Sequence, residues 1–122
     1  MKIKIDTKEK LTVLHLPEGV FSENMAEELA ATAAKRLQQP IKNMVINFAE
    51  ITQAAPAALL ALANIHQKAA ENNASLVLCH LNASIKKMLD ALDLSDVLNI
   101  TPTESEALDM VHMEEIEREM FG

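Results

Sequence analysis

Two short and almost uninterrupted apolar segments constrain the fold of this chain more than any other feature. They are residues 42–48 and 75–81. Strands with this pattern are typical of parallel sheets whose two faces are covered by helices. Between the two segments, apolar side chains recur at helical spacing, and Pro56 suits the first turn of a helix because its missing N–H would be unpaired there in any case. We therefore predict a central strand, a helix from about Pro56 to Asn73, and a second buried strand.

The other segments predict further strands and helices in alternation. Residues 2–7 and 10–16 read as a hairpin, and residues 97–100 as a short final strand. Ser22 is suited to cap a helix that ends before Pro40, and Thr103 with Glu106 forms a capping box for the last helix. The expected apolar stripes of the first three helices include Ala26, Leu29, Ala30, Ala33, Leu37, Leu59, Leu62, Ala63, His66, Ala70, Ile85, Met88, Leu89 and Leu92.

Strands that alternate with helices after an initial hairpin predict an α/β domain. We expect one mixed sheet of about five strands, with the later strands parallel, and about four helices. The chain has 122 residues, which fits a single domain over residues 1–122. Beyond Val111 the apolar residues no longer continue the apolar side of the last predicted helix, and Glu residues accumulate. This acidic segment, about residues 112–122, is expected to protrude or fray.

Composition excludes several classes of partner. The formal net charge of −7 argues against a nucleic-acid surface, which would concentrate Lys and Arg. No segment is long and apolar enough to suggest insertion into a membrane, so a cytoplasmic protein is the default expectation. Cys79 is the single cysteine, which rules out an internal disulfide, and its apolar neighbours predict a small buried side chain.

The sequence shows no pattern typical of an enzyme, a cofactor site or a metal site. The four histidines are scattered over different segments and lack a partner at ligand spacing: His15, His66, His80 and His112. His66 is read instead as a hydrogen-bonded histidine at the rim of the core. Gly19 and Gly122 are the only glycines, too few for a nucleotide-binding loop. We therefore expect a binding module rather than an enzyme.

The order of these elements and several motifs resemble the STAS family. The best match lies in the second half: Ser75-Leu76-Val77-Leu78, then Leu81-Asn82-Ala83-Ser84-Ile85-Lys86-Lys87-Met88-Leu89, Leu92-Asp93-Leu94-Ser95-Asp96-Val97-Leu98-Asn99-Ile100 and Glu104-Ser105-Glu106-Ala107-Leu108. In the first half, Val45-Ile46-Asn47-Phe48-Ala49-Glu50-Ile51-Thr52 looks like the central strand of the family and its exit. The family includes bacterial anti-sigma-factor antagonists, tails of anion transporters and accessory subunits of lipid transporters.

The resemblance also implies where a partner would bind. Members that work by partner switching carry a phosphorylated Ser or Thr at the start of the helix after the central strand. Here Ala57 occupies that position, so the resemblance implies a protein without the usual phosphorylation switch. The expected partner-binding surface consists of Thr52, Gln53, Ala55, Pro56, Ala57, Ala58 and Ala61. Close packing of small residues is the alternative interpretation of this segment, and Thr52 is an alternative site of modification.

Three kinds of partner follow from these observations. A serine-kinase-type anti-sigma factor is the first expectation, and the ATPase of an ABC-type lipid transporter is the second, both from the family resemblance. A homodimer is the third, formed either through the small residues near Pro56 or through the edge strand at residues 2–7. No cofactor or nucleic acid is expected.

Overall fold

The computed structural model describes residues 3–121 and contains the predicted mixed sheet. Its strands follow the spatial order β1-β2-β4-β6-β7. β1 and β2 form the predicted antiparallel hairpin, and the remaining neighbours are parallel. The strands span Lys4–Thr7 (β1), Thr12–His15 (β2), Met44–Asn47 (β4), Leu76–Cys79 (β6) and Asn99–Thr101 (β7). The apolar strand predicted as central, β4, lies in the middle of the sheet.

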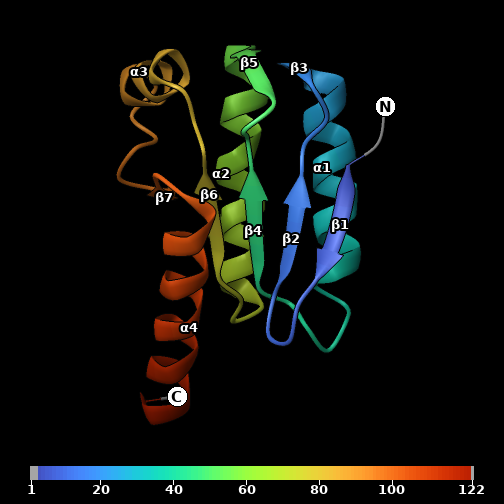
Figure 1. Ribbon diagram of the computed structural model, residues 1–122, viewed down its shortest axis with the longest axis vertical. Coiled ribbons are helices and arrows are strands. Elements are labelled where there is room, and N and C mark those ends of the chain that lie inside the picture. The colour runs from blue at the N-terminus through green and yellow to red at the C-terminus, as the bar shows by residue number, and fades with distance from the viewer. Residues whose placement is uncertain (1–2, 122) are drawn as a thin grey trace.

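The described residues form the four predicted helices. They span Glu23–Arg36 (α1), Pro56–Glu71 (α2), Ala83–Ala91 (α3) and Glu104–Phe121 (α4). In Figure 1, α1 and α2 lie behind the sheet, whereas α4 lies against the opposite face beside β6 and β7. The end of α4 extends past the lower ends of the strands. Because both faces are covered, the central strands are apolar on both sides.

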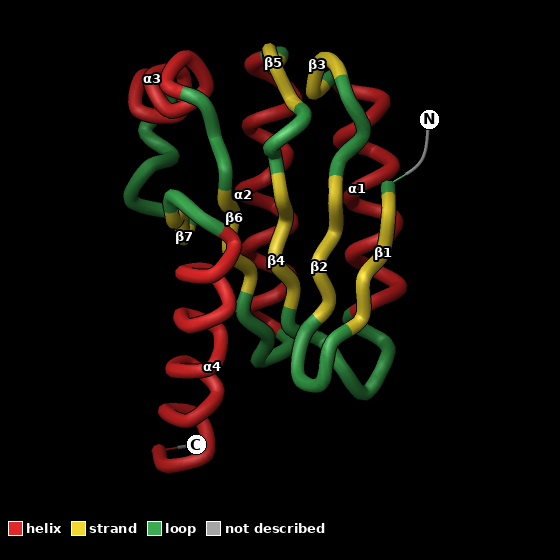
Figure 2. The backbone as a smooth tube through the Cα atoms, viewed as in Figure 1, coloured by secondary structure: helices red, strands yellow, loops and turns green. Residues whose placement is uncertain are grey.

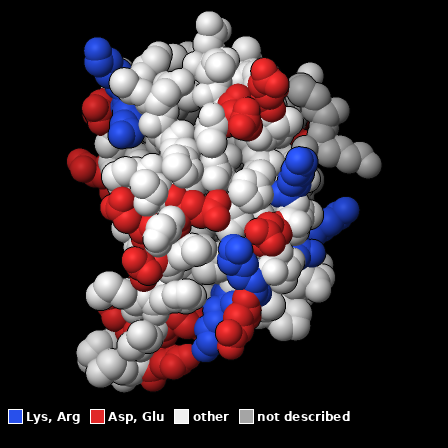
Figure 3. All heavy atoms as spheres, in the orientation of Figure 1, with Lys and Arg blue, Asp and Glu red and all other residues white. Residues whose placement is uncertain are grey.

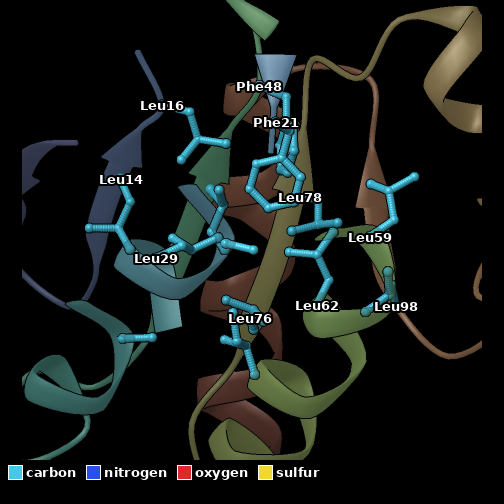
Figure 4. Packing of buried hydrophobic residues seen from close by; sticks show 14 of the residues in the cluster. Leu14, Leu16, Phe21, Leu29, Phe48, Leu59, Leu62, Leu76, Leu78 and Leu98 are labelled. Carbon is cyan, nitrogen blue, oxygen red and sulfur yellow. The ribbon is translucent and has the colours of Figure 1, made fainter. Parts of the chain in front are cut away.

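Side chains that alternate along the strands divide the core into two clusters. Ile46 belongs to the larger cluster with α1, α2 and α3, whereas Val45 belongs to the smaller one under α4. In the larger cluster the rings of Phe21 and Phe48 meet edge to face, with centroids 5.2 Å apart (Figure 4). Burial of a side chain of this size stabilises the fold by roughly 1.5–3 kcal/mol. The larger cluster therefore fixes α1 and α2 on the sheet.

Local capping explains where the helices begin and end. The Ser22 hydroxyl accepts a hydrogen bond from the Met25 N–H at 3.2 Å, which confirms the predicted cap of α1. At α4 the Glu106 N–H donates to Thr103 Oγ1 at 3.2 Å. Asn73 follows the end of α2 with φ of 56°, the left-handed conformation expected there.

A second, two-stranded sheet was not predicted. β3 (Gly19–Phe21) pairs in parallel with β5 (Ile51–Ala54). Figure 2 shows this small sheet beyond the carboxyl ends of β2 and β4. β5 reads ITQA, with only Ile51 buried, so it lacks the apolar alternation by which a strand is predicted from sequence. Pairing between distant segments decides its conformation.

The last strand is displaced from its predicted position. Residues 97–100 were expected, whereas β7 spans Asn99–Thr101. The N–H groups of Val97 and Leu98 both donate to the Leu94 carbonyl, at 3.1 and 3.0 Å. This turn after α3 uses the hydrogen bonds that a strand would need, so pairing with β6 begins two residues later.

Two helical positions also differ from the prediction. Ala30 and Ala70 were placed on apolar stripes but are exposed, because the buried faces of α1 and α2 are centred on larger neighbours such as Leu29 and Ile65. The acidic end of the chain protrudes as expected. It does not fray, because α4 remains helical to Phe121.

Candidate functional site

The start of α2 presents backbone donors without a capping side chain. Pro56 is the first helical residue, and Ala55 at the N-cap makes no side-chain hydrogen bond to the helix. The first turn contains no acidic residue. Unpaired N–H groups and the helix dipole give this end a positive potential. The site can therefore accept a carbonyl or carboxylate oxygen, but it contains no group that would attack a substrate.

Three hydrogen bonds fix the segment that leads into α2. The Ala55 N–H donates to the Phe21 carbonyl at 3.0 Å, and Thr52 Oγ1 donates to the Gly19 carbonyl at 3.3 Å. The Asn82 side-chain amide, at the start of α3, donates to the Thr52 carbonyl at 3.0 Å. Gly19 has φ of +127°, a conformation that favours glycine. β3 and α3 therefore hold the start of α2 in place from two sides.

The predicted site residues differ in exposure. Thr52, Gln53, Pro56 and Ala57 are exposed, and Ala55 and Ala61 are half-buried. Ala58 is fully buried at 0% exposure, so its assignment to a binding surface was wrong. It belongs to the same core cluster as Leu59 and Leu62, on the face of α2 that packs against the sheet.

Two large apolar residues at this site were missed. Leu60 is 49% exposed and Val20 is 46% exposed. Val20 pairs with Gln53 across the small sheet, which was not predicted. Leu60 was detectable in the sequence. It lies four residues before Asn64 and seven before Gln67, a spacing that places it on the polar side of the helix.

The exposed residues of this region are uncharged. No Asp, Glu, Lys or Arg occurs between Glu50 and Lys68. We call the exposed part of this region, with its neighbour on β3, the α2 surface; it comprises Val20, Thr52, Gln53, Pro56, Ala57 and Leu60. A neutral patch with exposed apolar side chains, in a chain of net charge −7, is suited to protein contact.

Other reactive groups lie elsewhere or are shielded. Burial, with a smaller contribution from the Glu104 carboxylate, raises the pKa of the Cys79 thiol to about 12. His66 is half-buried, and among the described residues its Nδ1 has no hydrogen-bond partner, contrary to the predicted hydrogen-bonded role.

Within residues 3–121, no three His, Cys, Asp or Glu side chains are grouped to hold a metal ion. None of the helices in this part of the chain has the length and hydropathy of a membrane span.

Comparison with known domain families decides the classification. The STAS domain model matches residues 2–107. The chain belongs to the STAS domain family. A search of curated proteins gave no matching relative.

Solved structures of STAS and related proteins share this fold. A putative anti-sigma factor antagonist from Thermotoga maritima has a TM-score of 0.80 and 15% identity, covering 90% of this chain and 94% of its own. An anti-sigma-factor antagonist (STAS) domain protein from Planctomyces limnophilus has a TM-score of 0.75 and 17% identity, with 90% and 97% coverage. A sulfate transporter family protein from Wolinella succinogenes has a TM-score of 0.76 and 12% identity, with 89% and 90% coverage. At these identities the likeness shows the fold alone.

Proposed function

We propose that this STAS domain protein is a cytoplasmic, non-catalytic module that binds a protein partner through the α2 surface. The observation that carries the proposal is the uncharged and exposed start of α2, where Ala57 and Leu60 face solvent. A partner can bury these apolar side chains and pair with the free N–H groups of the first turn. The antagonist-like neighbours favour a serine-kinase-type anti-sigma factor as this partner.

The same geometry suggests a module without a phosphorylation switch at the helix start. Ala57 is the second residue of α2, next to the unpaired N–H groups, where a phosphate would be strongly stabilised. Alanine offers no acceptor hydroxyl there. Among residues 51–61 only Thr52 carries a hydroxyl, and that group donates to the Gly19 carbonyl. The proposed module therefore stays in its binding form.

Ala57→Glu tests the surface directly. A carboxylate near a helix N-terminus is compatible with the helix, so the variant is expected to fold normally. Ala31→Glu is the matched control, because Ala31 is exposed in the middle of α1. Each protein is immobilised and used to capture partners from extract of the native cells, followed by mass spectrometry. We expect a kinase-type regulator to be retained by wild type and Ala31→Glu and lost with Ala57→Glu.

Two results would contradict this proposal. Equal capture by Ala57→Glu and wild type would remove the α2 surface from the interaction. Recovery of a transporter ATPase would favour the second candidate, an accessory subunit of an ABC-type lipid transporter. That candidate comes from the family resemblance, and the likeness to the sulfate transporter family protein supports it only in that a domain of this fold occurs in a transport protein. Neighbouring genes separate the two: a kinase or sigma-factor gene favours regulation, and permease and ATPase genes favour transport.

Self-association through β1 is a separate proposal. β1 is an edge strand of the five-stranded sheet, and its four residues are exposed. Free N–H and C=O groups on such an edge can pair with a second copy. Sedimentation equilibrium checks this: a dimer weakened by Ile5→Pro would support pairing through β1, whereas a monomer at high concentration would exclude it.

A further inference from the structure

The last turns of α4 expose a row of large apolar side chains. Met113 is 64% exposed, Ile116 is 56% exposed and Met120 is 70% exposed. Their spacing of three and four residues places them on one side of the helix. We call these three residues the α4 stripe. Phe121, 82% exposed, lies at its end. Monomeric proteins seldom expose several large apolar side chains together without a partner.

The rotation of α4 is fixed, so this exposure is a property of the fold. Ala107 and Val111 are fully buried against the sheet. Further along the same side, Arg118 Nη1 donates to Ser75 Oγ at 3.0 Å and Arg118 Nη2 donates to Asn43 Oδ1 at 3.1 Å. These contacts hold one face of α4 against the sheet. The α4 stripe lies on the opposite face and cannot turn inward without breaking them.

A hollow adjoins the α4 stripe. It has a volume of about 370 Å³ and lies between α4 and the turn that joins β1 to β2. Leu11, Leu108 and Ile116 are its apolar lining residues, and charged or polar side chains, Lys8 and Lys10 among them, line the rest. Through Ile116 the α4 stripe therefore continues into a concave site that can receive a side chain of a partner.

The charges beside the α4 stripe indicate which partner fits. Glu117 and Glu119 are exposed, and helical spacing places them on opposite sides of the α4 stripe. Glu119 Oε1 lies 3.9 Å from Lys10 Nζ, but this ion pair is exposed and contributes little, so a basic partner can replace Lys10 there. Arg118 is the only Lys or Arg after Lys87. Its side chain is directed to the sheet and pairs with Glu115 at 3.0 Å. Figure 3 shows acidic side chains around uncharged surface at the lower end of the molecule, where α4 ends, with basic side chains beside some of them. A second copy would bring the same carboxylates together, whereas a basic partner would neutralise them.

We propose that the α4 stripe is a docking surface for a basic amphipathic helix of another protein. Apolar residues of that helix, spaced three and four apart, pack on Met113, Ile116 and Met120, and its Lys or Arg residues pair with Glu117 and Glu119. Methionine side chains are flexible and suit such a contact. In Figure 1 the α2 surface lies at the opposite end of the molecule, so this contact is independent of the one proposed above.

The test uses a defined probe, an 18-residue peptide of leucine and lysine with the leucines at heptad spacing. Binding to the full chain is followed by NMR, which reports both affinity and the residues affected. The triple variant Met113→Gln/Ile116→Gln/Met120→Gln is compared with Leu60→Gln, which removes an exposed leucine from the α2 surface. We expect the triple variant to bind the peptide at least tenfold more weakly than wild type, and Leu60→Gln to bind it with unchanged affinity. Chemical-shift changes are expected along residues 112–121.

Three outcomes would overturn the proposal. The first is equal affinity of the triple variant and wild type, or shift changes away from α4. The second is equal binding of a leucine and glutamate peptide with the same pattern, which would remove the charge argument. The third is a dimer in sedimentation experiments that the triple variant dissociates, which would assign the α4 stripe to a second copy. Binding that weakens as salt rises would support the proposal.

Discussion

The Arg118 guanidinium, near the end of α4, donates a hydrogen bond to Asn43 Oδ1 across a separation of 75 residues in the sequence. Asn43 directly precedes β4 and receives a second hydrogen bond on the same oxygen from the Ser75 N–H at 2.9 Å. Its amide nitrogen donates to Glu115 Oε2 at 2.7 Å and to the Lys10 carbonyl at 3.1 Å. One buried asparagine therefore connects the starts of β4 and β6, the hairpin turn and α4.

Arg118→Ala is expected to loosen the end of α4. The substitution removes hydrogen bonds to Asn43, Ser75 and Glu115, so the free energy of unfolding should fall by about 1–3 kcal/mol. Urea denaturation measures the loss, and hydrogen exchange should show reduced protection of residues 112–121. Glu117→Ala, at the exposed neighbouring position, is the control. It should change the free energy of unfolding by less than about 0.5 kcal/mol and leave the protection of residues 112–121 unchanged. Unchanged protection in Arg118→Ala would contradict the anchoring role.

Glu115 is expected to make stability depend on pH. The hydrogen bond from Asn43 has the largest effect on the pKa of the Glu115 carboxyl and lowers it; burial, the next largest, raises it, and Arg118 and Lys10 lower it further, so that the pKa lies below its usual value. Because the folded pKa lies below the unfolded one, the carboxylate stabilises the fold above the unfolded value of about 4.3, and this stabilisation is lost as pH falls through the folded pKa. Glu115→Gln should therefore be less stable by about 1 kcal/mol at pH 7.

The difference between wild type and Glu115→Gln should shrink steadily below pH 4, as measured by urea denaturation across pH 2.5–7. Glu114→Gln, on the neighbouring half-buried residue, is the control for the general loss of one negative charge. A constant difference at all pH values would show that protonation of Glu115 is not coupled to folding.

Asn82→Ala should affect both α3 and the small sheet. Asn82 Oδ1 accepts the Ile85 N–H at 2.9 Å, and the amide nitrogen donates to the Thr52 carbonyl. Loss of an asparagine N-cap costs about 1 kcal/mol. Thermal unfolding measures this cost, and NMR should show shifts at residues 51–54. Ser84→Ala, at an exposed position within α3, serves as the comparison. Shifts confined to α3 would show that Asn82 does not hold β5.

Neighbouring alanines at the start of α2 should respond differently to substitution. Ala58 is fully buried, so Ala58→Leu would overpack the core and lower the free energy of unfolding by about 1–3 kcal/mol. Ala57→Leu adds the same atoms at an exposed position and should change stability by less than about 0.5 kcal/mol. If urea denaturation gave the same loss of stability for both variants, the side of α2 that faces the core would differ from the one described.

Cys79 should react with thiol reagents only after local or global opening. Its side chain is fully buried, and with its pKa raised to about 12 the thiol is protonated at neutral pH. We expect labelling by iodoacetamide at pH 8 to be far slower in native protein than in 6 M guanidinium, and to quicken in Arg118→Ala if α4 covers the thiol. Rapid labelling of native wild type would contradict the burial.

Some of the candidate site could be read from the sequence, and the rest could not. Helix start signals placed Pro56 and Ala57 correctly, because proline at a first helical position is a local preference. The family resemblance, by contrast, assigned Ala58 to the surface, and small residues carry too little periodic signal to reveal its burial. Val20 could not be found at all, because its place beside Gln53 depends on a pairing between distant strands.

The sequence by itself determined the α/β class, the hairpin, the buried strands β4 and β6, and the starts of α1, α2 and α4. These follow from short-range causes: apolar periodicity, capping side chains and turn residues, all acting within a few positions of the chain. The tertiary structure decided the β3–β5 sheet, the burial of Ala58 and the helical end of α4. Each of these depends on contacts between distant segments, as Arg118 and Asn43 show, and such contacts exist only after the chain has folded.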